Sequence, residues 1–196
     1  MAVTETRAPE RAEPWRWTVA EVLRMLDVGL LRSDSRTELM DGELVKKAVT
    51  QNGPHVTTIN RLTMRLAQAS GEDFVVSVQN ALVLGFRSMP EPDLVVHRAW
   101  DHDRLALPTI GEAVLVIEVA DSSVGSDRRR KIPLYARHRC PELWFIDLVQ
   151  RVLERHTEPR ADGFASVERH DDGEIAPHLA PELRIDVAAL LRGRTG

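Results

Sequence analysis

The sequence predicts a mixed α/β domain, of the α+β kind, in which helices cover a central sheet. Short β-rich apolar runs predict strands at residues 74–78, 81–86, 92–96, 114–119 and 143–147. Segments with apolar residues at helical spacing lie before and between these runs, and this arrangement indicates helices packed on a sheet. The chain has 196 residues, the length of one domain. We therefore expect a flexible arm over residues 1–14 and a single domain over residues 15–196.

Three local signals define the N-terminal part. Thr18 and Glu21 form a Thr-x-x-Glu capping box, which predicts the start of a short helix. The dipeptide Asp41-Gly42 interrupts an alternating run and is typical of a type I′ hairpin turn. Residues 54–69 predict a second helix. One face of that helix is expected to carry Val56, Ile59, Leu62, Thr63 and Leu66.

The second half of the chain predicts a helix followed by a hairpin. Ser126 is expected to cap this helix, which runs to His138 and contains Pro133. Further strands and a final short helix are expected at residues 143–147, 151–156 and 164–167 and after Asp186.

Composition limits the class of protein. The formal net charge is −4, whereas general nucleic-acid-binding proteins are usually strongly basic. Cys140 is the only cysteine, so no intrachain disulfide or cysteine zinc cage can form, which suits a reducing compartment. The apolar runs are too short to cross a bilayer, and the first residues contain no apolar signal segment. We therefore expect a cytoplasmic protein with no membrane partner.

Two carboxylates are candidates for chemistry. Glu118 lies in the most apolar predicted strand, where a carboxylate is costly unless it is paired or binds a metal. Asp93 follows Pro92 at the start of another predicted strand, a position where a turn residue is also common. If the two strands are neighbours, both carboxylates could bind a hard cation such as Mg²⁺. The alternative for Glu118 is an ion pair with an arginine at the strand end.

Lys131 is the third candidate. Only three of the 26 basic residues are lysines, and Lys131 lies on the predicted helix just after the Glu118 strand. An amine can lose a proton and a guanidinium cannot, so a rare lysine favours a chemical role. The alternative is an exposed ion pair between Lys131 and Asp127. Other chemistries are not indicated, because the sequence lacks a Gly-x-Ser-x-Gly elbow, a glycine-rich phosphate loop and zinc-type histidine spacing.

The ordered set of motifs resembles a known family. Its pieces are Glu38-Leu-Met-Asp-Gly-Glu-Leu-Val, His55 at a helix start, Pro92-Asp93-Leu-Val-Val, Val-Ile-Glu118-Val-Ala-Asp-Ser-Ser, Asp127-x-x-x-Lys131-x-x-x-Tyr135-Ala and Pro141-Glu-Leu-Trp144-Phe-Ile-Asp147. Over roughly residues 17–155, this order resembles the Uma-two family of restriction-endonuclease-like proteins, which is assigned to the PD-(D/E)xK nuclease superfamily. The resemblance implies an αβββαβ restriction-endonuclease-like core with extra N- and C-terminal hairpins.

The resemblance also implies roles for these residues. Asp93 matches the motif's aspartate and Glu118 its acidic position, while Ala120 stands where the motif has a lysine. Lys131 is the natural replacement for that lysine. The Lys131-x-x-x-Tyr135 pattern is also similar to the Gln-x-x-x-Tyr helix of related nucleases.

The implied function is Mg²⁺-dependent hydrolysis of DNA phosphodiester bonds, with Mn²⁺ as a substitute. Asp93, Glu118 and the Val119 carbonyl would hold the ion, and Lys131 would orient the attacking water. Secondary candidates are Glu43, His55 and Tyr135. A homodimer would supply a larger basic surface for DNA. The alternative is a catalytically degenerate nuclease-fold protein that acts as a binding or regulatory module.

Overall fold

A six-stranded sheet forms the centre of the molecule. The computed structural model describes residues 13–32, 35–47, 53–100, 106–121 and 124–192, so the predicted arm at 1–14 lies almost entirely outside the described residues. The strand order is β3-β4-β5-β6-β7-β8. The strands are β3 (Phe74–Val78), β4 (Leu94–Arg98), β5 (Ala113–Ala120), β6 (Glu142–Asp147), β7 (Val152–Arg160) and β8 (Gly163–His170). All neighbouring pairs are antiparallel except β5 and β6, which are parallel.

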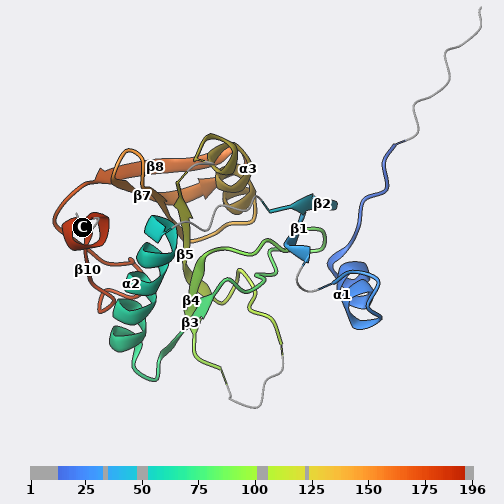
Figure 1. Ribbon diagram of the computed structural model, residues 1–196, viewed down its shortest axis with the longest axis horizontal. Coiled ribbons are helices and arrows are strands. Elements are labelled where there is room, and N and C mark those ends of the chain that lie inside the picture. The colour runs from blue at the N-terminus through green and yellow to red at the C-terminus, as the bar shows by residue number, and fades with distance from the viewer. Residues whose placement is uncertain (1–12, 33–34, 48–52, 101–105, 122–123, 193–196) are drawn as a thin grey trace, which may run out of the picture.

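Helices cover both faces of this sheet (Figure 1). Helix α2 (Gly53–Ser70) and the short α4 (Val187–Leu191) pack on one face, where Ile117 of β5 lies in the same apolar cluster as Leu62 and Leu190. Helix α3 (Val124–Arg137) connects β5 to β6 and packs on the other face against Val116. Because side chains alternate along a strand, β5 is buried on both sides, and all eight of its residues are buried. The predicted helix-covered sheet is therefore confirmed.

The N-terminal elements form a separate layer at one end of the molecule (Figure 1). They are α1 (Val19–Asp27), β1 (Thr37–Met40) and β2 (Glu43–Lys46). The capping box of Thr18 and Glu21 is present. Asp41 and Gly42 have φ angles of 49° and 82°, as a type I′ turn requires at both central positions. The hairpin joins the rest of the chain through backbone hydrogen bonds between Leu39 and Met89.

Three local predictions were wrong. The run at 81–86 is not a regular strand but makes isolated bridges, because its neighbouring segment contains Pro90, which has no N–H to donate to a ladder. Helix α3 begins at Val124, so Ser126 lies inside its first turn and is not the N-cap. On α2, Val56 is 40% exposed. The predicted positions Ile59, Leu62 and Leu66 are buried, and the buried face of α2 also includes His55, Thr58 and Ser70.

The C-terminal region adds a small two-stranded sheet that the sequence did not indicate. It pairs β9 (Glu174–Ile175) with β10 (Ile185–Asp186), and Asp186 then caps α4, as its position before that helix predicted. Within the described ranges, no helix is both long and apolar enough to cross a membrane.

Candidate active site

Asp93 and Glu118 lie side by side on two central strands, just before β4 begins and near the end of β5. We call this rim of the sheet, which is formed by strand ends and not by an outer strand, its edge. Leu94 at the start of β4 pairs with Ile117 of β5, so Asp93 lies opposite Glu118 on the neighbouring antiparallel strand. Residues that face each other in this way project from the same face of the sheet. Asp93 Oδ2 also accepts a hydrogen bond of 2.8 Å from the backbone N–H of Val119. Both carboxylates are buried, as the sequence predicted for a shared site.

The carboxylate of Glu118 is held by two donors from α3. Lys131 Nζ donates to Oε1 at 2.9 Å and to Oε2 at 2.8 Å. Tyr135 Oη donates to Oε1 at 2.7 Å. Lys131 and Tyr135 are one helical turn apart, so both reach the same strand from one helix face. Lys131 is only 5% exposed, which rules out the exposed ion pair that was its alternative.

The hairpin contributes two residues that sequence reasoning missed. Glu38 on β1 is buried, lies 3.5 Å from Lys131 Nζ and accepts a hydrogen bond from the N–H of Glu91. Lys47 Nζ lies 4.0 Å from Asp93 Oδ1 and donates to the carbonyl of Glu91. Glu38 is the first residue of the Glu38-Leu-Met-Asp-Gly-Glu-Leu-Val motif, and Lys47 is one of only three lysines. The motif and the rarity of lysine could therefore have indicated these two residues.

Glu43 does not join this group. It pairs with Arg16 at 2.6 Å and its side chain is 52% exposed. The hairpin lies along α3, with Asp41 in its turn paired to Arg137. Arg137 is six residues beyond Lys131, or about 9 Å along the helix. Glu43 follows the turn and so lies at the wrong end of the hairpin, which corrects its assignment as a secondary site residue.

His55 approaches the site from the opposite face of the sheet. It lies in the first turn of α2, is 8% exposed and places Nε2 at 3.4 Å from Asp93 Oδ2. The hydrogen bond with Asp93 raises the pKa of His55, although burial opposes this. The structure therefore brings together His55, Asp93, Glu118, Lys131 and Tyr135 from the predicted set.

The electrostatics of Glu118 and Lys131 follow from burial and from an excess of acids. Burial raises the pKa of Glu118 to about 7, even though the charge of Lys131 opposes this shift. Burial disfavours the charged form of Lys131, but the charges of Glu118, Glu38 and Asp93 outweigh it and raise the Lys131 pKa. The raised pKa and the two hydrogen bonds that Lys131 donates to Glu118 favour its ammonium form.

Asp93 behaves differently from Glu118. Burial raises the pKa of Asp93, but the hydrogen bond from His55 and the charges of Lys47 and Lys131 outweigh burial and lower it. Asp93 therefore stays ionised, whereas Glu118 holds a proton more readily. Two carboxylates with opposite shifts are typical of sites that perform chemistry.

Comparison with known proteins identifies the family. The family model described as "Uma2: Putative restriction endonuclease" matches residues 19–188, which include every residue of this site. The chain belongs to the Uma2 family. A crystal structure described as "a putative nuclease belonging to DUF820", from Anabaena variabilis ATCC 29413, is similar to it with a TM-score of 0.70. That likeness covers 89% of this chain and 97% of that one at 17% identity, which shows a shared fold. No curated protein matches the chain.

The donor atoms of this Uma2 site suit a hydrated divalent cation. Asp93 Oδ1 is buried and has no hydrogen-bond partner among the described residues. Mg²⁺ prefers oxygen ligands and often binds through one or two carboxylates while it keeps several waters. No cluster of three or more His, Cys, Asp or Glu that could hold a metal occurs in the described part of the chain, so a complete protein cage is not present there. Within this group Asp93 Oδ1 is left for such an ion, whereas both oxygens of Glu118 already accept hydrogen bonds from Lys131 and Tyr135.

Proposed function

We propose that the chain is a divalent-metal-dependent endonuclease that hydrolyses DNA phosphodiester bonds. The observation that carries this proposal is the buried group of Asp93, Glu118 and Lys131 at one edge of the sheet. Membership of a family described as restriction endonucleases supports the reaction class. The carboxylates of Glu38, Asp93 and Glu118 face the ammonium groups of Lys47 and Lys131 and the imidazole of His55. Asp93 Oδ1 still lacks a hydrogen-bond donor among the described residues, which favours a further cation there.

Each residue has a distinct role in this proposal. Asp93, Glu118 and the Val119 carbonyl would hold Mg²⁺ or Mn²⁺. When bound, the ion lowers the pKa of a water and neutralises charge on the phosphate. Lys131 keeps its proton, so it stabilises developing negative charge by donating hydrogen bonds. Tyr135 positions Glu118 through its 2.7 Å hydrogen bond.

A second candidate function is a non-catalytic binding or regulatory module. It is favoured because Lys131 and Tyr135 already donate hydrogen bonds to Glu118. The carboxylate therefore has its hydrogen-bond partners without a metal ion. A buried ion pair of this kind can also be purely structural. The two candidate functions differ in whether the protein cuts DNA when a divalent metal is present.

We also propose a cytoplasmic homodimer. The single cysteine supports a reducing compartment. A single domain with a net charge of −4 offers little basic surface, and two copies would present twice as much to one duplex.

Nicking of supercoiled plasmid DNA in Mg²⁺ or Mn²⁺ tests the endonuclease proposal. Asp93→Asn and Glu118→Gln should each lower the nicking rate about 100-fold or more, because each removes charge at the reaction centre. Glu43→Gln is the matched control, since it removes an exposed carboxylate outside the group and should leave the rate unchanged. Thermal unfolding of each variant checks that it is folded. An inactive wild type, or equal rates in all four proteins, would overturn the proposal.

A further inference from the structure

A basic pocket opens at the same edge of the sheet as the candidate active site. Its volume is about 550 Å³, and it is lined by Arg151, Arg169 and Arg192 together with a single acid, Asp171. The remaining lining comes from Gln150 in the turn before β7, from Val152 at the start of β7, and from Ala188 and Leu191 of α4. Three guanidinium groups and one carboxylate line the pocket, and a second carboxylate, that of Glu154, lies behind the lining at 3.7 Å from Arg169. The lining itself therefore carries an excess of positive charge.

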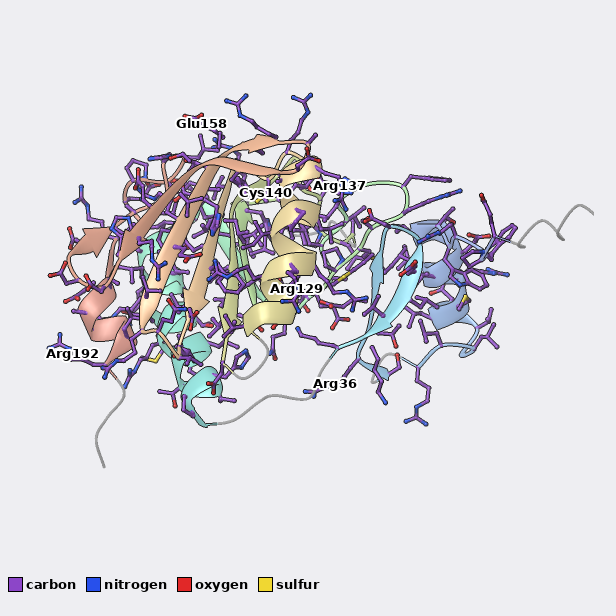
Figure 2. All side chains as sticks on the ribbon, turned by 90° about the horizontal axis from the view of Figure 1, so that it is seen from above. Arg36, Arg129, Arg137, Cys140, Glu158 and Arg192 are labelled. Carbon is purple, nitrogen blue, oxygen red and sulfur yellow. The ribbon has the colours of Figure 1, made fainter. Side chains whose placement is uncertain are left out.

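The strand ends place this pocket beside the site. The C-terminal ends of β5 and β6 meet at one edge, since Ala120 pairs with Asp147 and Leu148 N–H donates to the Ala120 carbonyl. The turn that follows leads directly to Arg151. Figure 2 shows Arg192 and the Arg129 end of α3 toward one side of the molecule, with Arg137 and Glu158 toward the other. Glu118, two residues before Ala120, therefore shares this edge with the pocket.

A continuous row of side chains connects the two places. Glu118 pairs with Phe145, Phe145 with Glu154, and Glu154 with Arg169, across β5, β6, β7 and β8. Arg128, one helical turn before Lys131, lies over the Phe145 ring with its guanidinium 4.8 Å from the ring centre. Arg128 pairs with Glu154 at 2.5 Å, and Arg169 lies 3.7 Å from the same carboxylate. A chain of ion pairs thus connects the active site to the pocket, with Arg128 and Arg169 on either side of Glu154.

We propose that this pocket binds the phosphate backbone of the nucleic-acid strand that is being cut. The inference rests on the proposed nuclease function and names where the substrate is held. Guanidinium groups match phosphate oxygens in geometry as well as charge. Arg169 is oriented by its 2.8 Å hydrogen bond to Gln150, and Arg151 by its 3.2 Å hydrogen bond to the Leu191 carbonyl. Each of these arginines uses only some of its five N–H donors in these bonds.

The spacing suits DNA. Neighbouring strands lie about 4.8 Å apart, so Arg169, three strands from Glu118, is about 14 Å away. One strand of duplex DNA advances about 3.4 Å per phosphate. Because the backbone also winds around the helix axis, phosphates of one strand lie farther apart than this axial rise, so the pocket would hold a phosphate fewer than about four nucleotides from the bond that is cut.

A second pocket lies on the other side of α4 and is less suited to phosphate. Its volume is about 470 Å³, and it is lined by Arg61, Arg65 and Arg184 together with Glu174 and Asp186. Arg184 pairs with Glu174 at 3.1 Å, and both acids are part of that lining. In the first pocket only Asp171 is part of the lining, and Glu154 lies outside it.

DNA binding as a function of salt tests the proposal. Fluorescence anisotropy of a labelled DNA duplex, measured without divalent metal so that no cleavage occurs, would compare the wild type with the double variant Arg169→Ala, Arg192→Ala. Loss of two phosphate contacts should reduce the slope of log K against log salt by about two. The matched control is Arg98→Ala, Arg160→Ala, which removes the same charge at the opposite ends of β4 and β7.

The outcomes separate this inference from the proposed function. A reduced slope in the pocket variant but not in the control, with KM raised and kcat for cleavage retained, supports the pocket. Wild-type slope and KM in the pocket variant would overturn the inference and leave the nuclease proposal standing. If inorganic phosphate stabilises the wild type but not the pocket variant, and DNA binding is equal in both, the pocket takes a small anion and the inference fails. A wild type that neither binds nor cuts DNA removes both proposals.

Discussion

Lys131 Nζ donates to both carboxylate oxygens of Glu118, at 2.9 and 2.8 Å. The helix residue thereby places an ammonium beside the strand acid, although Ala120 stands where the superfamily motif has its lysine. Because of this contact, we expect the site to keep its lysine function even though position 120 is an alanine.

Lys131→Arg is expected to abolish most nicking, as Lys131→Ala does. The side chain is buried between two acids, and a larger planar guanidinium cannot take the same position without displacing its neighbours. Both variants should still fold and still respond to metal in thermal unfolding. Plasmid nicking with matched protein concentrations measures the effect. Full activity in Lys131→Arg would show that only the charge matters, as a structural ion pair requires.

Divalent metal is expected to stabilise the wild type. An ion that binds only the folded state at one hundred times its Kd adds about 2.7 kcal/mol, which for a chain of this size raises Tm by roughly 5–10 °C. The double variant Asp93→Ala, Glu118→Ala should lose this shift, whereas Glu43→Ala should keep it. Thermal unfolding with Mg²⁺, Mn²⁺ or EDTA gives the comparison. An equal shift in the double variant would place the ion elsewhere.

Tyr135 should not ionise in the folded protein at pH values where tyrosine normally does. Burial, followed by the charge of Glu118, raises its pKa well above 10. Tyr135 is the only tyrosine, so tyrosinate absorbance reports this group alone. The absorbance should stay flat until the protein unfolds in base and then rise in one cooperative step. The denaturant-unfolded chain is the control and should titrate near pH 10. A smooth native titration near pH 10 would show that Tyr135 is not held against Glu118.

His156 should make the protein less stable in mild acid. Burial lowers the pKa of His156, and the nearby charge of Glu154 opposes this only in part. The unfolded state therefore takes up a proton near pH 6.5 that the folded state accepts only at lower pH, so stability falls as pH falls through this window. His156→Gln should lose less stability between neutral pH and pH 5 than the wild type. Urea unfolding at a series of pH values checks this, with the more exposed His170→Gln as the control. Parallel pH curves for wild type and His156→Gln would contradict the prediction.

The sequence by itself determined the main framework of the fold and most of the site. Apolar runs marked β5 and β6, the capping box fixed the start of α1, and Asp41-Gly42 fixed the hairpin turn, because each of these signals acts within a few residues. Asp93 and Glu118 could be paired in advance because strand alternation gives each carboxylate a definite side of the sheet.

Only the tertiary structure decided which hairpin acid joins the site and how the lysine is charged. Glu38 and Glu43 lie in the same motif, and the contact of Leu39 with Met89 brings Glu38 to Lys131 while Glu43 stays at the turn. That contact joins residues 50 positions apart, so no local pattern encodes it. The protonation of Lys131 likewise depends on acids from three separate segments gathered in one buried space, where their summed charge outweighs the cost of burial.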